Sequence, residues 1–317
     1  MDRVRRADVV STEGGMKAVI AALLANLGIA VSKFVAFAFT GSSSMLSEAI
    51  HSVADSGNQV LLLVGNKRSK KAPDAKHQFG YGRRRYVYGF IVSIVLFLVG
   101  GLFSLYEGFH KFQHPEELSD AWIAFVVLGI AIVLEALSFR TAVREANHAR
   151  GKRSLFRFLR DARQPELPVI LLEDLGALVG LVFALFGVSM AVATGDGRWD
   201  GLGAMAVGTL LVVIAIFLAF EMAAMLVGES ALPEEDAAIR AALASSPLVD
   251  RVIHVRTLHV GPDELLVGAK IAISKSDTGA EIAAGIDDAE ARVRTAVPTA
   301  TYVFIEPDID RTDPGSA

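Results

Sequence analysis

The stretch SSSMLSEAIHSVADS, residues 42–56, places ionisable side chains inside an otherwise apolar part of the chain. On a helix, Glu48, His51 and Asp55 have the spacing i, i+3 and i+7, so they share one face, and His51 lies one turn from Asp55. An imidazole and a carboxylate placed this way can hold one metal ion together. Ionisable groups at membrane depth are costly, and they usually face a bundle interior or an ion path. The stretch therefore predicts a cation-binding helix inside a membrane protein.

The composition of the whole chain agrees with a membrane protein. Of its 317 residues, 52% are hydrophobic, and the mean hydropathy is +0.45. These values are too high for a water-soluble enzyme of this length, so they favour a multi-span membrane protein that is not an enzyme. Because the chain contains no cysteine, a bound metal would take its ligands from His, Asp, Glu or other oxygen donors.

Six long apolar runs predict a six-helix transmembrane domain over residues 16–230, preceded by a cytoplasmic segment, residues 1–15. A secretory signal is the alternative for the first run. That run is long enough to span, however, and it ends in Gly41-Ser42-Ser43 rather than at a small-residue cleavage site. The expected spans are residues 16–40, 45–65, 86–107, 121–142, 167–193 and 202–227.

Basic residues predict the orientation of these spans. Lys and Arg crowd into residues 67–85 and 144–163, whereas the connections on the opposite side contain only Lys111 and Arg198. Positively charged loops remain on the cytoplasmic side of a membrane. We therefore expect a multi-pass integral protein of the lipid bilayer with both termini in the cytoplasm.

The composition becomes that of a soluble domain after Leu232-Pro233. A helix that begins at Pro233 is followed by alternating runs typical of strands, a second helix and a third strand. This αββαβ order predicts a small cytoplasmic two-layer α+β domain over residues 231–310. Residues 311–317 are expected to form a disordered tail.

A second pair of acids lies in the fifth expected span. Glu173 and Asp174 occur where lipid would reject them. Gly176 and Gly180 form a small-xxx-small face, which allows another helix to approach closely. The simplest joint interpretation is one cation site made by His51, Asp55 and Asp174.

Two motifs resemble those of a known family. GSSSMLSEAIHSVAD (residues 41–55) and KHQFGYGR (residues 76–83), together with six spans and a small cytoplasmic domain, are similar to the cation diffusion facilitators. The resemblance implies a homodimeric exporter of a divalent metal, usually Zn²⁺, that works by alternating access as an antiporter with H⁺ as the coupling ion and with no prosthetic group. It also implies a ferredoxin-like fold for the cytoplasmic domain and a location in a bacterial inner membrane. The sequence leaves Mn²⁺, Fe²⁺ and Co²⁺ open as alternative cargoes.

The resemblance assigns the transport site to His51, Asp55 and Asp174. A further ligand commonly stands four residues before the last aspartate, and here that position is Ile170. Glu173 or a water molecule would then complete the site. The Glu173-Asp174 pair resembles the branch of divergent animal zinc transporters.

The resemblance also suggests three secondary features. A loop metal site would use Asp74 and His77, and a weak metal site in the cytoplasmic domain would use His259, Glu306 and Asp308. An interdomain charge pair would join Arg83 to Glu229.

Other interpretations accompany these assignments. Glu48 is a candidate for attracting cations at the outer mouth. Packing or interfacial placement is favoured for Glu107 and Glu135, and for Asn26 and Lys33, which share a face of the first span. The basic loops are expected to contact lipid, and they lack the soluble basic face that a nucleic-acid partner would need. The alternative from another functional class is a membrane metal sensor or scaffold that transports nothing.

Overall fold

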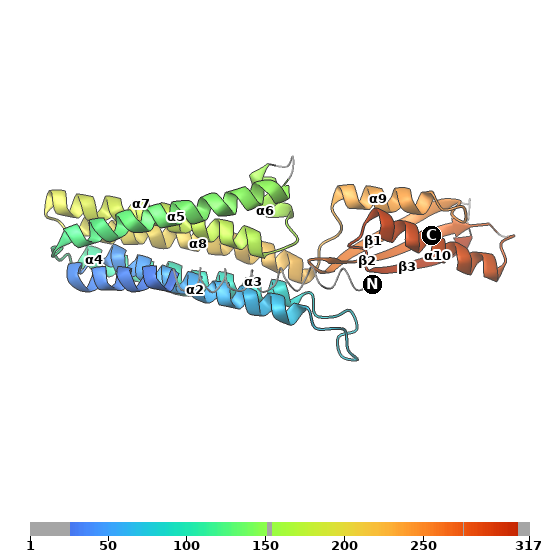
Figure 1. Ribbon diagram of the computed structural model, residues 1–317, viewed down its shortest axis with the longest axis horizontal. Coiled ribbons are helices and arrows are strands. Elements are labelled where there is room, and N and C mark those ends of the chain that lie inside the picture. Colours follow the sequence, from blue (N-terminus) through green and yellow to red (C-terminus); the bar gives the residue numbers. More distant parts are fainter. Residues whose placement is uncertain (1–25, 151–153, 275, 310–317) are drawn as a thin grey trace, which may run out of the picture. The chain divides into compact units, whose positions relative to one another are not determined.

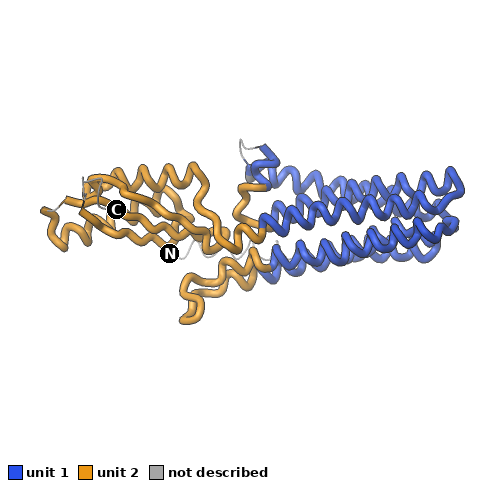
Figure 2. The backbone as a smooth tube through the Cα atoms, turned by 180° about the vertical axis from the view of Figure 1, so that it is seen from behind, with its two compact units in different colours: residues 1–65, 88–159, 166–221 blue, residues 66–87, 160–165, 222–317 orange. Residues whose placement is uncertain are grey.

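The computed structural model describes residues 26–150, 154–274 and 276–309. The chain forms two compact units: residues 1–65, 88–159 and 166–221 make up the first, and residues 66–87, 160–165 and 222–317 the second (Figure 2). The predicted N-terminal segment, the first part of the first span and the predicted tail lie outside the described residues.

The first unit is a bundle whose helices run side by side (Figure 1). The helices α3, η1 and α4 follow one another without a break, and η1 is a π-helical segment. The helical segments are Asn26–Thr40, which is the described part of the first helix, α2 (Ser43–Ser69), α3 (Arg84–Val95), η1 (Leu96–Leu102), α4 (Phe103–Gln113), α5 (Ala121–Arg150), α6 (Leu155–Asp161), α7 (Glu166–Thr194) and α8 (Arg198–Val227).

Within the described residues, four helices are long and apolar enough to cross a membrane: Arg84–Gln113, Ala121–His148, Glu166–Thr194 and Arg198–Val227. They coincide with the third to sixth predicted spans. The described part of the first helix is apolar but shorter, and α2 carries many polar and charged residues. The protein is therefore a helical membrane protein with four clear spans.

In the described residues of the bundle, two apolar cores lie on either side of a polar layer. One core contains Leu62 of α2 and Val169 of α7, and the other contains Met45 of α2 and Leu181 of α7. Along both helices, the ionisable residues named above fall between these core positions. The charged groups therefore lie between two apolar layers of the bundle, where membrane lipid would solvate them poorly.

The second unit contains a three-stranded sheet with the order β1-β2-β3. Strand β2 pairs with β1 in antiparallel register and with β3 in parallel register. The element order is the αββαβ order that the sequence predicts. The elements are α9 (Pro233–Ala244), β1 (Arg251–Gly261), β2 (Glu264–Ile273), α10 (Gly279–Ala296) and β3 (Tyr302–Ile309).

Both helices of this unit pack against the same side of the sheet. Leu243 of α9, Val267 of β2 and Val293 of α10 belong to one buried core. Helix α10 begins with a capping box, in which the Thr278 side chain and the Glu281 side chain each bond the other's backbone N–H. The unit is thus a two-layer arrangement with its core between helices and sheet.

Candidate functional site

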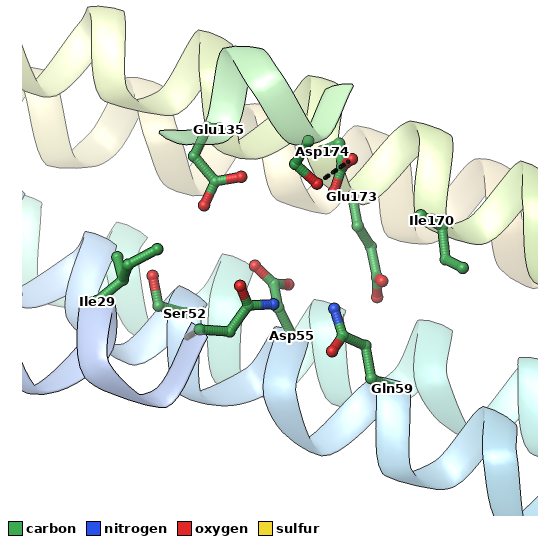
Figure 3. A pocket seen from close by; sticks show the side chains of 10 residues that line it. Ile29, Ser52, Asp55, Gln59, Glu135, Ile170, Glu173 and Asp174 are labelled. Atoms are coloured by element: carbon green, nitrogen blue, oxygen red, sulfur yellow. Dashed lines mark hydrogen bonds between the residues drawn. The ribbon is translucent and has the colours of Figure 1, made fainter. Parts of the chain in front are cut away.

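A small cavity lies among the first helix, α2, α5 and α7 (Figure 3). Its volume is about 20 Å³, which is room for about one water molecule or one bare ion. Four of its lining residues carry a carboxylate. The lining residues are Asn26, Ile29, Ser52, Asp55, Gln59, Glu135, Ser138, Ile170, Glu173 and Asp174.

Helix α2 brings His51 beside Asp55, as the sequence spacing predicts. The Nε2 atom of His51 lies 3.4 Å from Oδ2 of Asp55, and the His51 side chain is fully buried. Neither ring nitrogen of His51 has a hydrogen-bond partner among the described residues. On the other side of the ring, a Cβ built on Gly100 of η1 would lie 3.9 Å from Nδ1. The imidazole therefore keeps free donor or acceptor capacity while Asp55 lines the cavity.

Helix α7 sends Glu173 and Asp174 toward different neighbours, and both line the cavity (Figure 3). Asn58 of α2 donates from Nδ2 to Oε1 of Glu173 at 2.7 Å. Ser138 of α5 donates from Oγ to Oδ2 of Asp174 at 2.9 Å. Each carboxylate is thereby oriented by a partner on a different helix, and Glu173 reaches α2 from a regular helix.

Glu135 of α5 is the fourth carboxylate on the cavity, and its position differs from the packing or interfacial placement that we expected. The side chain points into the space between α5 and α2 (Figure 3). In the sequence, Glu135 and Ser138 lie one turn apart within an apolar span. This spacing places both on one face of α5, but it does not show whether that face is directed toward the other helices or toward lipid.

The predicted ligands are only partly gathered. Asp55, Glu173 and Asp174 line one cavity, while His51 contacts Asp55 and is not among the lining residues. Over the described part of the chain, no three His, Asp or Glu side chains surround a common point closely enough to hold a metal ion. Ile170, at the position of the missing ligand, also lines the cavity.

A buried ion pair lies one turn from this cavity. Lys33 donates from Nζ to Oε2 of Glu48 at 3.0 Å and to Oγ of Ser52 at 2.8 Å. The side chains of Lys33 and Glu48 are both completely inaccessible. Glu48 therefore does not occupy an outer mouth, and Lys33 is an internal counter-charge instead of a packing residue.

The two glycines of α7 permit close helix contacts, as the sequence predicts, but with two different neighbours. A Cβ on Gly180 would lie 2.6 Å from Oε1 of Glu48 in α2, and a Cβ on Gly176 would lie 2.8 Å from Ile214 in α8. Gly180 thus gives the Glu48 carboxylate the space it occupies.

The serines that open α2 have a role that the sequence did not reveal. Asp200 of α8, which is buried, accepts hydrogen bonds from Oγ of Ser42 at 2.7 Å and from the backbone N–H of Ser43 at 2.6 Å. Ser44 donates from Oγ to the carbonyl oxygen of Asp200 at 2.8 Å. A carboxylate from another helix therefore satisfies free N–H groups at the start of α2.

The residues of the expected loop site have other partners. The Nδ1 atom of His77 lies 3.6 Å from Oδ1 of Asp74. Tyr81 donates from its hydroxyl to Oδ2 of Asp74 at 2.6 Å, and Lys71 donates to the same oxygen at 2.9 Å. These hydrogen bonds, that of Tyr81 above all, hold the pKa of the Asp74 carboxyl well below its usual range. Asp74 thus organises the loop through Tyr81 and Lys71.

The three residues of the expected second-unit metal site do not come together. Lys270 forms ion pairs with both Glu306, at 3.1 Å, and Asp308, at 3.0 Å. Glu306 is level with Lys270 of β2, whereas His259 is level with Leu265. Five residues of strand correspond to about 16 Å, so His259 lies near the opposite end of the sheet.

The charge pair at Glu229 also differs from expectation. Arg163 donates from Nη1 to Oε2 of Glu229 and from Nη2 to the carbonyl oxygen of Ser230. Arg83, the expected partner, forms no ion pair with Glu229 in the described residues. Several arginines precede the spans, and charge alone did not identify which one reaches this carboxylate.

Comparison with known proteins gives consistent matches. Residues 19–227 match the family described as the cation efflux transmembrane domain. The chain is 33% identical over 268 residues to the Mus musculus protein named proton-coupled zinc antiporter SLC30A9, mitochondrial. The aligned residues make up 84% of this chain and 47% of that protein. It is 24% identical over 257 residues to the manganese efflux system protein MneP of Bacillus subtilis, and these residues make up 79% of this chain and 81% of that protein.

A third relative is the Magnetospira magnetosome protein MamB, which is 28% identical over 271 residues, with 82% of this chain and 85% of that protein covered. The chain spans about half the length of the animal relatives that it matches.

Proposed function

Because the chain belongs to the cation diffusion facilitator family, we propose that it exports a divalent metal cation, Zn²⁺ first among the candidates, in exchange for protons. The cavity lined by Asp55, Glu135, Glu173 and Asp174 is the observation that carries this proposal. Two further facts support it: a relative is named a proton-coupled zinc antiporter, and the ligands are imidazole and carboxylate, which suit Zn²⁺.

The charge of the cavity supports exchange in particular. Four carboxylates around a space of about 20 Å³ cannot all remain charged and uncompensated in a low-dielectric interior. Compensation comes either from protons on the carboxylates or from a divalent cation between them. Since both occupy the same groups, loading the metal releases protons and reloading protons releases the metal.

Each site residue has a distinct part in this cycle. Asp55 and Asp174 supply the charged ligands, and His51, next to Asp55, supplies a neutral imidazole once α2 shifts toward the cavity. Glu173 or a water molecule completes the coordination of a tetrahedral ion. Because the described geometry is not that of a closed ligand set, a change in helix position accompanies binding in this scheme, as alternating access requires.

The decisive experiment measures metal flux in vesicles reconstituted with the full chain. Zn²⁺, Mn²⁺, Fe²⁺ and Co²⁺ are presented separately, with and without an imposed pH gradient. We expect Asp55→Ala and Asp174→Ala to abolish flux while the protein still inserts. Glu145→Ala serves as the matched control, because Glu145 is an exposed carboxylate on the same helix as Glu135. Wild-type flux in either aspartate variant would contradict the site, and absence of flux in the unmodified protein would favour a sensor or scaffold.

We further propose a homodimer with six spans and both termini on the cytoplasmic side, in a bacterial inner membrane. The basic residues of the connections that flank α3 and α7 support this orientation. Since the chain has no cysteine, Ser316→Cys provides a single labelling position. Labelling of that cysteine from outside intact cells would refute the orientation.

A further inference from the structure

The second unit contains a groove that the transport proposal does not use. The connection between α2 and α3 and one end of the sheet enclose a volume of about 420 Å³. Among the described residues, none of those that line it carries a carboxylate. Its lining combines the basic residues Lys76, Arg83 and Arg84 with the apolar residues Phe79, Val87, Leu258, Val260 and Leu266.

The lysine and the two arginines of this groove have no carboxylate partner among the described residues. Elsewhere in the same unit, Arg85 pairs with Asp263 and Arg163 pairs with Glu229. In the part of the chain that the structure describes, neither Arg83 nor Arg84 forms an ion pair. Glu229 pairs with Arg163 and not with Arg83, so an anion from outside the unit could neutralise the charges of Arg83 and Arg84.

The contact between Arg84 and Tyr81 orients the Arg84 guanidinium for binding an anion. Its guanidinium carbon lies 4.1 Å from the centre of the Tyr81 ring. A cation–π contact occupies the flat face of the guanidinium and leaves its edge N–H donors free. Those edge donors match the oxygens of a phosphate in a bidentate arrangement. Tyr81 is itself fixed by its hydrogen bond to Asp74.

The other wall of the groove suits hydrocarbon. Phe79 is 44% exposed and Val87 is 41% exposed, and the rings of Phe79 and Tyr302 form a T-shaped pair with a centroid distance of 5.2 Å. Gly80, with φ +77°, closes the turn that presents Phe79, and its N–H donates to the carbonyl oxygen of His77. An exposed aromatic ring beside unpaired arginines matches an amphiphilic ligand.

The position in the chain identifies the source of that ligand. Arg84 is the first residue of the membrane-crossing helix Arg84–Gln113, and Val87, one turn later, still lines the groove. A helix that crosses a membrane enters it through the headgroup region, so the first residues of Arg84–Gln113 are expected to lie close to lipid headgroups. We propose that this groove binds one anionic phospholipid, whose phosphate is held by Arg83, Arg84 and Lys76 and whose acyl chains cover Phe79 and Val87.

The test uses the full-length protein in detergent, with equal amounts of phosphatidylglycerol and phosphatidylcholine added, and counts retained lipids by native mass spectrometry. We expect one phosphatidylglycerol to be retained selectively. The double variant Arg83→Gln/Arg84→Gln is expected to weaken its retention roughly 25-fold, about fivefold for each charge. Arg157→Gln/Arg160→Gln is the matched control, because it removes two exposed arginines from the other basic connection, and it should leave retention unchanged.

Three results would overturn the proposal. Equal loss of lipid in the two double variants would show general charge attraction. Displacement of the lipid by soluble glycerol 3-phosphate at the same concentration would show a site for free phosphate. A disulfide between two copies carrying Phe79→Cys, in a chain with no other cysteine, would show that a second copy covers the groove. Thermal unfolding of Arg83→Gln/Arg84→Gln near the wild-type temperature establishes that the variant is folded, and none of these readouts depends on metal transport.

Discussion

Replacing Lys33 by methionine isolates the contribution of the buried ion pair to stability. Lys33 and Glu48 are both fully inaccessible, and Nζ lies 3.0 Å from Oε2, so Lys33→Met leaves the Glu48 carboxylate without its counter-charge. Breaking one side of a buried pair costs about 3 to 5 kcal/mol. For a unit of this size, each kcal/mol lowers the unfolding temperature by roughly 2 to 4 °C, so we expect a decrease of about 6 to 20 °C.

The double variant Lys33→Met/Glu48→Gln distinguishes the charge pair from simple packing. It removes both charges while preserving side-chain volume, so it should recover most of the lost stability. The assay is thermal unfolding of the full-length protein in detergent, monitored by the monodisperse fraction that remains after heating. If the double variant is no more stable than Lys33→Met, the two charges do not compensate each other and the reasoning fails.

Three further perturbations have defined outcomes. Gly180→Ala places a methyl group 2.6 Å from Oε1 of Glu48. It should lower the unfolding temperature, because overpacking costs about 1 to 3 kcal/mol and the gain in helix propensity is only about 1 kcal/mol. Gly129→Ala is the control, since its methyl group meets nothing within 4 Å, and it should be neutral or stabilising in the same unfolding assay. Glu173→Gln should weaken metal binding at least about tenfold by titration calorimetry, and unchanged affinity would exclude that carboxylate as a ligand. Burial, and then Arg163, lowers the pKa of His259, so the unfolded chain binds a proton that the folded chain resists. The associated stability is complete above about pH 6.5 and decreases as the pH falls. Wild-type protein should therefore lose more stability between pH 7.5 and pH 5.5 than His259→Leu, and equal losses would contradict this.

Local sequence patterns predicted the features that depend on one element. The His51–Asp55 contact follows from helical spacing, and the αββαβ order follows from a helix start at Pro233 and from alternating apolar positions. Gly176 and Gly180 correctly indicated close helix contacts. The first two features depend only on residues of the same helix or strand. The third depends on the absence of a side chain at glycine, which allows any neighbouring helix to approach.

Features that depend on how helices turn toward one another were not predictable in the same way. Glu135 lines the cavity because of the rotation of α5, and a single acid in an apolar span does not reveal that rotation. Several arginines of the same charge were candidate partners for Glu229, and in the structure Arg163 forms the ion pair. Lys270 neutralises Glu306 and Asp308, which the family resemblance had suggested as metal ligands.

The carboxylate of Asp200 is hydrogen-bonded to the start of α2, so a tilt of this helix about that point would move each residue in proportion to its distance from Ser43. From Ser43 to His51 the helix axis advances about 12 Å, and from Ser43 to Asp55 about 18 Å, at 1.5 Å per residue. A tilt of roughly 10° about that point would displace His51 by about 2 Å and Asp55 by about 3 Å. The two residues would therefore move by unequal amounts in one rotation, and under the proposed function a single tilt of α2 would change the distances of His51 and Asp55 from Asp174 of α7 by different amounts.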